Sequence, residues 1–361
     1  MLTVFSVILG CLIVMTGVLI VLSPGRPRPI LNAERRPVVG SISEKTFVTI
    51  NGVSQGMFIM GRDKDSPVLL YVHGGMPDYF LTERYPTGLE NYFTVCWWEQ
   101  RGAGLSYRPG IDKKTLTVEQ LISDTIAVTN YLRDRFGKEK IYLMGHSGGT
   151  FIAIQAAAKA PHLYHAYLGV AQVSNPLKSE LLAYEYMVSE FQKNGDTRMA
   201  RRLKAAPVTL REGVPKSYLS LRDVAMHRLG IGTTHDMKSV FTGLVLPSFL
   251  CRQYTLREKF NMWRAKASSG VSVVWDAMIT TDLGVTVPQL DLPVYFIEGI
   301  HDYTCSYTEA RRYFNKLKAP IKGFYTFNLS AHSPLFEEPA RLNKIIQEDV
   351  LNARNELSDP I

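Results

Sequence analysis

The sequence predicts an α/β fold, in which helices flank a mostly parallel sheet. Short apolar runs of strand length alternate along the chain with longer segments of helical periodicity. These runs are continuously apolar, which is typical of strands buried on both faces of a parallel sheet. Glycine-rich or polar turns follow several of them, at the strand ends where such sheets bind their ligands.

The composition excludes several classes of protein. The 361 residues are 46% hydrophobic and 20% charged, which is typical of a globular chain long enough for a buried core. The four cysteines are far apart, so we predict neither a disulfide framework nor a metal site, and no cofactor. The net charge of +8 comes without a nucleic-acid-binding motif, so we expect no nucleic-acid partner.

The first 22 residues differ from the rest of the chain. Residues 2–22 contain no charged side chain, and as a helix they would span about 31 Å. That length is sufficient to cross a hydrocarbon core of about 30 Å, so we predict a transmembrane anchor at 1–22 that contacts a lipid bilayer. A cleaved signal peptide is the alternative, but the basic start and the small-residue cleavage motif are missing. A lipoprotein signal ending at Cys11 is disfavoured because the apolar run continues beyond it.

A linker rich in proline and arginine follows at 23–44. Its arginines lie on the C-terminal side of the apolar segment, which favours a cytoplasmic position for that side. We therefore expect a single-pass membrane protein whose main domain faces the cytoplasm.

Residues 45–174 contain the elements of the first part of an α/β domain. A hairpin at 46–60 turns at Asn51-Gly52, and a helix begins at Thr117, which forms a capping box with Gln120. The remaining predicted elements are strands at 68–72, 94–98, 141–144 and 166–173, and a buried helix at 151–160.

The pattern changes between residues 175 and 290, where the periodicity is mostly helical. We predict a helical cap there. Strands at 294–297 and 324–329, with a helix at 310–317 between them, indicate that 291–361 completes the α/β domain. The cap carries 16 Lys and Arg against 10 Asp and Glu, which indicates either a solvated face or a surface directed at anionic lipid.

The sequence Gly145-His146-Ser147-Gly148-Gly149 has the spacing of a nucleophile elbow. A buried strand precedes it and a buried helix follows it, which is the context that this motif requires. The turn is so tight that its flanking positions accept only small residues. We therefore predict that Ser147 is a nucleophile.

A serine nucleophile needs a base and an acid that orients the base, in the chain order Ser, Asp or Glu, His. His332 follows the last predicted strand and is the candidate base. Asp302 lies in the loop after the preceding strand, and Glu298 is the alternative acid. An oxyanion also needs N–H donors. We expect these from Gly148, next to the nucleophile, and from Gly75 in the His73-Gly74-Gly75 turn.

Together these motifs resemble those of the α/β-hydrolase superfamily. Within it the chain is most similar to the proline iminopeptidase-like serine aminopeptidases, over about residues 46–352. The motifs that carry the resemblance are HGG at 73–75, WWEQRGAGLSY at 97–107, GHSGGT at 145–150 and SAHS at 330–333. It implies a helical cap whose acidic residues hold the ammonium group of a substrate, with Glu180, Glu185 and Glu190 as candidates. The chain departs from the family by having HGGMPD for HGGPG, Glu99 for an aspartate, and Gly148 where tryptophan is frequent.

Three functions are compatible with these observations. The first is a membrane-anchored serine hydrolase of the aminopeptidase type that acts on a small peptide or amide through an acyl-enzyme. The second is an esterase or lipase of the same fold, which the anchor and the small residue at 148 favour. The third, a non-catalytic binding protein, is disfavoured because the residues of a complete triad are present.

Overall fold

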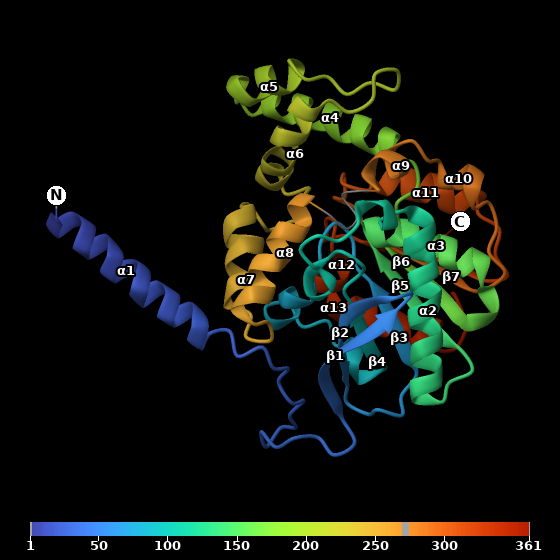
Figure 1. Ribbon diagram of the computed structural model, residues 1–361. Coiled ribbons are helices and arrows are strands. Elements are labelled where there is room, and N and C mark those ends of the chain that lie inside the picture. Colours follow the sequence, from blue (N-terminus) through green and yellow to red (C-terminus); the bar gives the residue numbers. More distant parts are fainter. Residues whose placement is uncertain (1, 269–273, 361) are drawn as a thin grey trace.

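The computed structural model describes residues 2–268 and 274–360, and an eight-stranded sheet lies at its centre (Figure 1). The strand order is β1-β2-β4-β3-β5-β6-β7-β8. Strand β2 pairs antiparallel with β1 and β4, and all other pairs are parallel, which confirms the predicted mostly parallel sheet. The strands are β1 (Ile42–Ile50), β2 (Val53–Gly61), β3 (Val68–Val72), β4 (Thr94–Trp98), β5 (Ile141–His146), β6 (Tyr164–Val170), β7 (Val294–Gly299) and β8 (Lys322–Phe327).

The first two strands form the predicted hairpin. Asn51 and Gly52 have φ values of 45° and 77° at its turn, and two successive positive φ values match the right-handed twist of paired strands. The helix predicted at 117–136 is α2 (Val118–Phe136), and the side chain of Thr117 accepts a hydrogen bond from the Gln120 amide at 3.1 Å.

Side chains on successive strand positions enter two separate cores, one on each face of the sheet. Leu70 and Leu143 belong to the core beneath α2, α3 (Gly148–Lys159) and α11 (Tyr307–Lys316). Their neighbours Tyr71 and Met144 belong to the core beneath α12 (Pro334–Glu337) and α13 (Pro339–Ile345). Both faces are therefore buried, which explains why the strands are continuously apolar.

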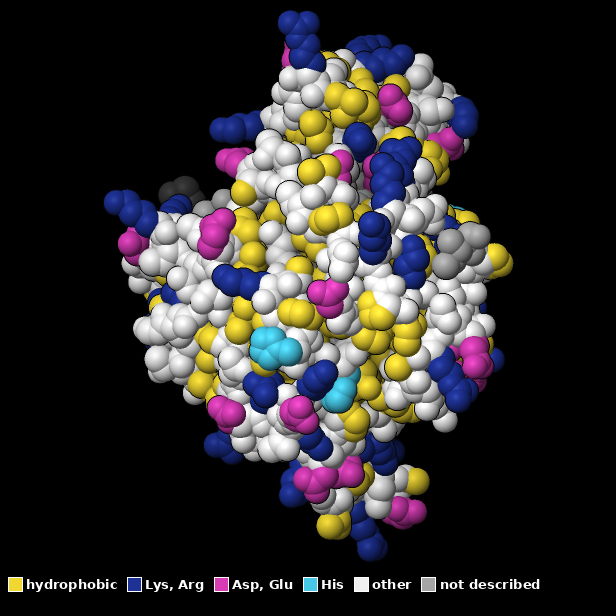
Figure 2. All heavy atoms as spheres, turned by 90° about the vertical axis from the view of Figure 1, so that its right-hand side faces the viewer, with side chains coloured by type: hydrophobic (Ala, Val, Ile, Leu, Met, Phe, Trp, Pro, Cys, Tyr) yellow, Lys and Arg dark blue, Asp and Glu magenta, His cyan; other side chains and the backbone are white. Residues whose placement is uncertain are grey.

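Seven α-helices separate β6 from β7 among the described residues, together with a π-helical turn at Phe241–Val245. They are α4 (Pro176–Lys193), α5 (Thr197–Lys204), α6 (Lys216–Leu229), α7 (Leu246–Leu250), α8 (Leu256–Ser268), α9 (Trp275–Ile279) and α10 (Leu283–Thr286). Helices α4 to α6 project from the body and have a small core of their own (Figure 1). On the face drawn in Figure 2, many basic side chains lie on this projecting part, with some acidic ones among them. Residues 269–273 of the predicted cap lie outside the described residues.

The N-terminal segment forms a helix, α1 (Leu2–Val21), that extends away from the sheet and cap (Figure 1). Its bounds agree with the segment predicted at 1–22. Within residues 2–268 and 274–360, however, no helix combines the length and the apolar character required to cross a membrane. The predicted transmembrane anchor is therefore not found in the structure.

Candidate active site

The candidate nucleophile occupies the turn between β5 and α3. Ser147 has φ 56° and ψ −131°, a backbone conformation that residues with a side chain rarely adopt. Such conformations persist only where the surrounding structure enforces them, and they concentrate at functional sites. The turn places Ser147 at the carboxyl edge of the sheet, before the first turn of α3.

Close packing explains the glycines around this turn. A Cβ atom on Gly145 would lie 2.7 Å from the Cα of Thr150, and one on Gly149 would lie 2.0 Å from the carbonyl oxygen of Val72. Both distances are far shorter than van der Waals contact. The spacing of small residues around Ser147 is therefore required by the neighbouring backbone.

Residues that follow three different strands meet at Ser147. The Nε2 atom of His332, after β8, lies 2.7 Å from the Oγ atom of Ser147. The Nδ1 atom of His332 lies 2.9 Å from Oδ2 of Asp302, after β7. The other Asp302 oxygen accepts hydrogen bonds from the amides of Thr304 at 2.7 Å and Cys305 at 3.1 Å.

The environment of Asp302 keeps its carboxylate charged. Burial alone would raise the pKa of Asp302, but His332 and the two amides hold it below its ordinary value. The anion accepts the Nδ1–H of His332, which leaves Nε2 free to accept the Ser147 proton. The arrangement is therefore that of a nucleophile, a base and an orienting acid.

The loop that carries His332 is held on both sides of the imidazole. One oxygen of Glu337 accepts hydrogen bonds from the amides of Ala331 at 3.0 Å and Ser333 at 3.3 Å. Burial raises the pKa of Glu337 to about 7, although its backbone hydrogen bonds oppose this shift. The amide of His332 donates to the carbonyl of Gly232 in the cap at 3.3 Å, so the cap also contacts this loop.

The two predicted oxyanion donors, Gly75 and Gly148, line the same pocket as the nucleophile. Gly148 is the first residue of α3, so its N–H lies at the N-terminus of the helix, where the helix dipole favours negative charge. The turn before Gly75 is fixed by His73, whose Nδ1 donates to the carbonyl of Gly74 at 2.8 Å and whose Nε2 accepts from the Gln100 amide at 3.1 Å. Burial lowers the pKa of His73 to about 4, so the ring is neutral and suited to both bonds.

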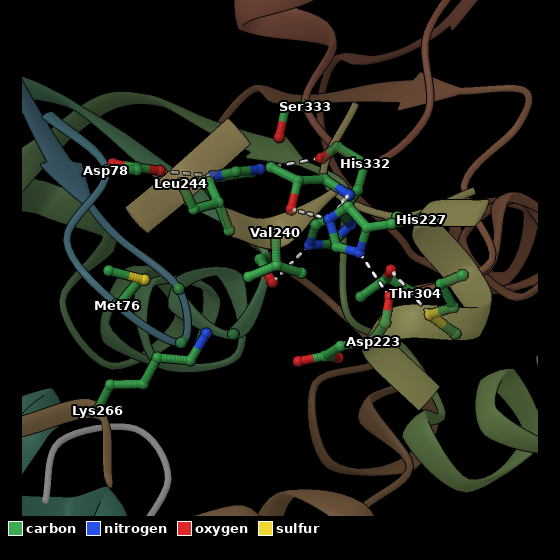
Figure 3. Close-up of a pocket in the computed structure, with 18 of the residues that line it drawn as sticks. Met76, Asp78, Asp223, His227, Val240, Leu244, Lys266, Thr304, His332 and Ser333 are labelled. Atoms are coloured by element: carbon green, nitrogen blue, oxygen red, sulfur yellow. Dashed lines mark hydrogen bonds and ion pairs between the residues drawn. The ribbon is translucent and has the colours of Figure 1, made fainter. Parts of the chain in front are cut away.

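A cavity of about 620 Å³ has Ser147 in its lining. Figure 3 shows this cavity in close-up. Much of its wall is apolar and comes from both the sheet loops and the cap, including Met76, Phe80, Leu81, Leu219, Val240 and Leu244. Asp223 and Lys266 lie on the side of the cavity away from His332 (Figure 3). The cavity can therefore hold an apolar group near the nucleophile and a charged group farther away.

The alternative acid, Glu298, lies within β7 and is fully buried. One of its oxygens accepts a hydrogen bond from the Gln172 amide at 2.9 Å. Burial raises its pKa well above the ordinary value, which disfavours the charge that an orienting acid needs. Asp302, not Glu298, makes the contact with His332.

The three acids suggested for substrate binding are not among the cavity-lining residues that the structure describes. Glu180 is buried and bound by Arg222 at 2.6 Å, and Glu190 pairs with Lys193 at 2.7 Å. Glu185 is exposed. The acidic residues of the described lining are Asp78 and Asp223 instead.

Asp302, Cys305 and His332 are the only group of possible metal ligands found in the described part of the chain. Burial and the neighbouring Asp302 raise the pKa of the Cys305 thiol well above its ordinary value. A thiol in that state is a poor ligand, because metals bind the thiolate. The donor set therefore does not fit zinc.

Sequence reasoning missed two side chains that contact the backbone of this loop. His146 bonds to the carbonyl of His332, and Glu337 bonds to the flanking amides. The available signals were weak: a polar residue that ends a buried strand, and an acid five residues after the candidate base. Their partners could be identified only once the strands were assembled.

Comparison with known proteins agrees with this geometry. Residues 68–339 match the family described as serine aminopeptidase, S33. The chain is 32% identical over 308 residues to “Probable aminopeptidase YbaC” of Bacillus subtilis, covering 84% of this chain and 95% of that protein.

Solved structures with lower sequence identity share the fold of this chain. The proline iminopeptidase of Mycobacterium smegmatis superimposes with a TM-score of 0.61 at 14% identity, covering 86% of this chain and 98% of that one. A proline iminopeptidase-related protein of Thermus thermophilus gives a TM-score of 0.56 at 20% identity, covering 86% and 98%. These similarities establish the α/β-hydrolase fold, and the family match and the Bacillus relative establish the branch. The chain is thus a serine hydrolase of the S33 serine aminopeptidase family, in the proline iminopeptidase-like branch of the α/β-hydrolase superfamily.

Proposed function

We propose that this serine hydrolase is an aminopeptidase that cleaves small peptides or amides through an acyl-enzyme on Ser147. The observation that carries the proposal is the 2.7 Å contact between Ser147 Oγ and His332 Nε2 at the wall of a cavity of about 620 Å³. The name of the Bacillus relative supports a peptide substrate.

The proposed reaction begins when the Nε2 atom of His332 accepts the hydroxyl proton of Ser147. The Oγ atom then bonds to the substrate carbonyl carbon, and the carbonyl electrons move to the oxygen, which faces the N–H groups of Gly148 and Gly75. When the intermediate collapses, the C–N bond breaks and His332 gives its proton to the leaving amine. Water repeats the sequence on the acyl-enzyme, releasing the acid product and restoring Ser147.

Asp223 is the carboxylate that we assign to the substrate's ammonium group. Asp78, the other acid of the described lining, already accepts hydrogen bonds from Tyr71 and His146 through one oxygen. Asp223 pairs with Arg222 at 3.2 Å, but its side chain is 56% exposed and lines the cavity, so a substrate can still reach it. Partial desolvation would raise the pKa of Asp223, but Arg222 and Lys266 hold it below its ordinary value, so it is an anion. We expect Asp223→Asn to raise KM for substrates with a free α-amine and to leave the rate of fluorophosphonate labelling, a reaction that involves no amine, unchanged.

The proposal is tested with matched aminoacyl-arylamides and acyl esters that carry the same acyl group. An aminopeptidase turns over the arylamides with a free amine and loses this activity when the amine is acetylated. Ser147→Ala is the control for background hydrolysis. Esters hydrolysed in the absence of any arylamide turnover would contradict the assignment.

An esterase is the second candidate, and the apolar lining of the cavity favours it. Met76, Leu81 and Leu244 offer no hydrogen bonds from their side chains, so an acyl chain would fill this region as well as a peptide side chain. The same substrate panel separates the two candidates. A non-catalytic role is disfavoured by membership of the hydrolase family.

We further propose that residues 2–22 attach the enzyme to a membrane. The support is the absence of charge in this segment, together with the exposed apolar side chains of Phe5, Val14 and Val21. Fractionation of cells that express the full chain or a chain without residues 1–22 tests this proposal. Attachment predicts that only the full chain stays with the membranes after a high-salt wash, whereas recovery of the full chain in the supernatant would contradict it.

A further inference from the structure

Both ring nitrogens of His146 are hydrogen bonded, although this residue is not part of the proposed triad. Its Nδ1 atom lies 2.9 Å from Oδ2 of Asp78, and its Nε2 atom lies 2.9 Å from the backbone oxygen of His332. The two partners of this imidazole, Asp78 and His332, are labelled in Figure 3. The ring is buried, so water does not compete for these bonds.

The partners determine the charge of the ring. A backbone carbonyl can only accept a hydrogen bond, and the Asp78 oxygen already accepts one from the Tyr71 hydroxyl at 2.6 Å. A neutral imidazole has one N–H and could satisfy only one of the two acceptors. With Asp78 ionised as a carboxylate, the two bonds therefore require His146 to be an imidazolium. Burial by itself lowers the pKa of His146, but Asp78 and the His332 carbonyl raise it above its ordinary value.

We propose that His146 is a positioning residue, which as an imidazolium bridges Asp78 and the backbone carbonyl of His332 and so holds the base against Ser147. The inference rests on the proposed function, because it assumes that His332 is the base.

The bridge links the nucleophile and the base through the backbone of these two residues. His146 precedes Ser147 in the chain, and its ring binds the backbone of the residue that must accept the Ser147 proton. The same ring is bonded to the loop after β3, which carries the oxyanion candidate Gly75. A displacement of about 1 Å between such groups can cost on the order of 10²-fold in rate. Loss of the bridge should therefore lower kcat more than it changes KM.

The bridge also predicts a dependence on pH. The ionisable groups that face His146 are Tyr71, His73 and Asp78 from β3 and its loop, Asp302 after β7, and His332 after β8. When His146 loses its proton, the remaining N–H bonds to the Asp78 carboxylate, and the bare Nε2 faces the His332 oxygen. We therefore expect kcat to fall at alkaline pH, in a step separate from the acidic limb that protonation of His332 produces.

Two substitutions of His146 by residues with an amide side chain distinguish the bond to His332 from the bond to Asp78. The amide of glutamine reaches about as far as Nε2, so His146→Gln keeps a donor for the His332 carbonyl. The amide of asparagine reaches about as far as Nδ1, so His146→Asn contacts Asp78 only. We expect His146→Asn to lose about 10²-fold in kcat with KM nearly unchanged. His146→Gln should stay within about fivefold of wild-type kcat and lose the alkaline limb.

Asp78→Asn provides a second test, which does not require that the His146 variants fold. The amide that this substitution introduces can donate to a neutral His146 whose Nε2–H still bonds to His332, so activity should persist and the alkaline limb should disappear. Equal losses of kcat in His146→Gln and His146→Asn would overturn the inference, as would an unchanged alkaline limb in Asp78→Asn. Failure of the proposed function would appear differently, as wild-type enzyme that a fluorophosphonate does not label on Ser147.

Discussion

A Cβ atom on Gly74 would lie 2.6 Å from the Cβ of Ser147 and 3.0 Å from its Oγ. The HGG turn after β3 therefore packs directly against the candidate nucleophile. Next to it, a Cβ atom on Gly75 would meet nothing within 4 Å. Gly74 therefore has no room for a side chain, whereas Gly75 has, and substitution of each by alanine can measure this difference.

We predict that Gly74→Ala lowers the rate of fluorophosphonate labelling by at least about 10²-fold, because the added methyl displaces Ser147. Gly75→Ala is the matched control, since it keeps its N–H and has room for the methyl group. Its labelling rate should stay within a few-fold of wild type. Similar rates for the two variants would show that the HGG turn does not constrain the nucleophile.

We predict that Asp302→Asn lowers kcat by up to about 10⁴-fold, because an amide cannot hold the tautomer of His332 that leaves Nε2 unprotonated. Glu298→Gln should change kcat little, since Glu298 contacts the Gln172 amide rather than the base. Steady-state kinetics on one substrate compare the two variants. If Glu298→Gln were the more damaging, the assignment of the acid would be wrong.

A buried ion pair joins the loop after β4 to α2. Arg101 Nε lies 2.6 Å from Asp124 Oδ2, and both side chains are buried. We predict that Arg101→Met lowers the free energy of unfolding by about 3–5 kcal/mol, because it leaves the buried Asp124 charge without a cation and with amide donors alone. Lys344→Met, which removes an exposed pair with Glu348, is the control and should leave the denaturation midpoint unchanged. An equally small effect of both would contradict the structural role of Arg101.

We predict that stability falls with rising pH because of Glu99. Burial raises its pKa to about 8, from an ordinary value of about 4.5, so the folded state holds this proton more tightly than the unfolded state. The stabilisation is fully present below the unfolded pKa and is lost as the pH rises to the folded pKa, by at most about 1.4 kcal/mol per pH unit. Glutamine does not titrate, so Glu99→Gln should gain in Tm relative to wild type between pH 5 and pH 8. A constant difference in Tm would contradict this account.

Much of the fold could be predicted because strands that are buried on both faces of the sheet consist almost entirely of apolar residues. The strands at 68–72 and 94–98 lie where their apolar runs predict them, and the helix at 117–136 begins after its capping threonine. The order of the strands in the sheet was not predicted. It depends on contacts between distant segments, such as the parallel pairing of β3 with both β4 and β5.

In the candidate site, too, features local to the sequence could be predicted, and contacts between distant segments could not. Ser147, Asp302 and His332 were predicted from their positions after strands, and the structure brings their side chains together. Their catalytic roles stay predictions. The bridge through His146 was not predicted, because its partner His332 is 186 residues away in the chain. The cap acids Glu180 and Glu190 were candidates because the family resemblance implies acidic residues in the cap, and the sequence does not show that arginine and lysine side chains bind them.

The most direct test of the central claim is to map the residue that a fluorophosphonate modifies, by mass spectrometry of the full-length protein after proteolysis. We predict one adduct, on the peptide that contains Ser147, and loss of substrate turnover in proportion to labelling. Ser147→Ala should show neither labelling nor turnover, and His332→Ala should label far more slowly, because Ser147 then lacks its base. An adduct on another residue, or full turnover by Ser147→Ala, would contradict the assignment of Ser147 as the nucleophile.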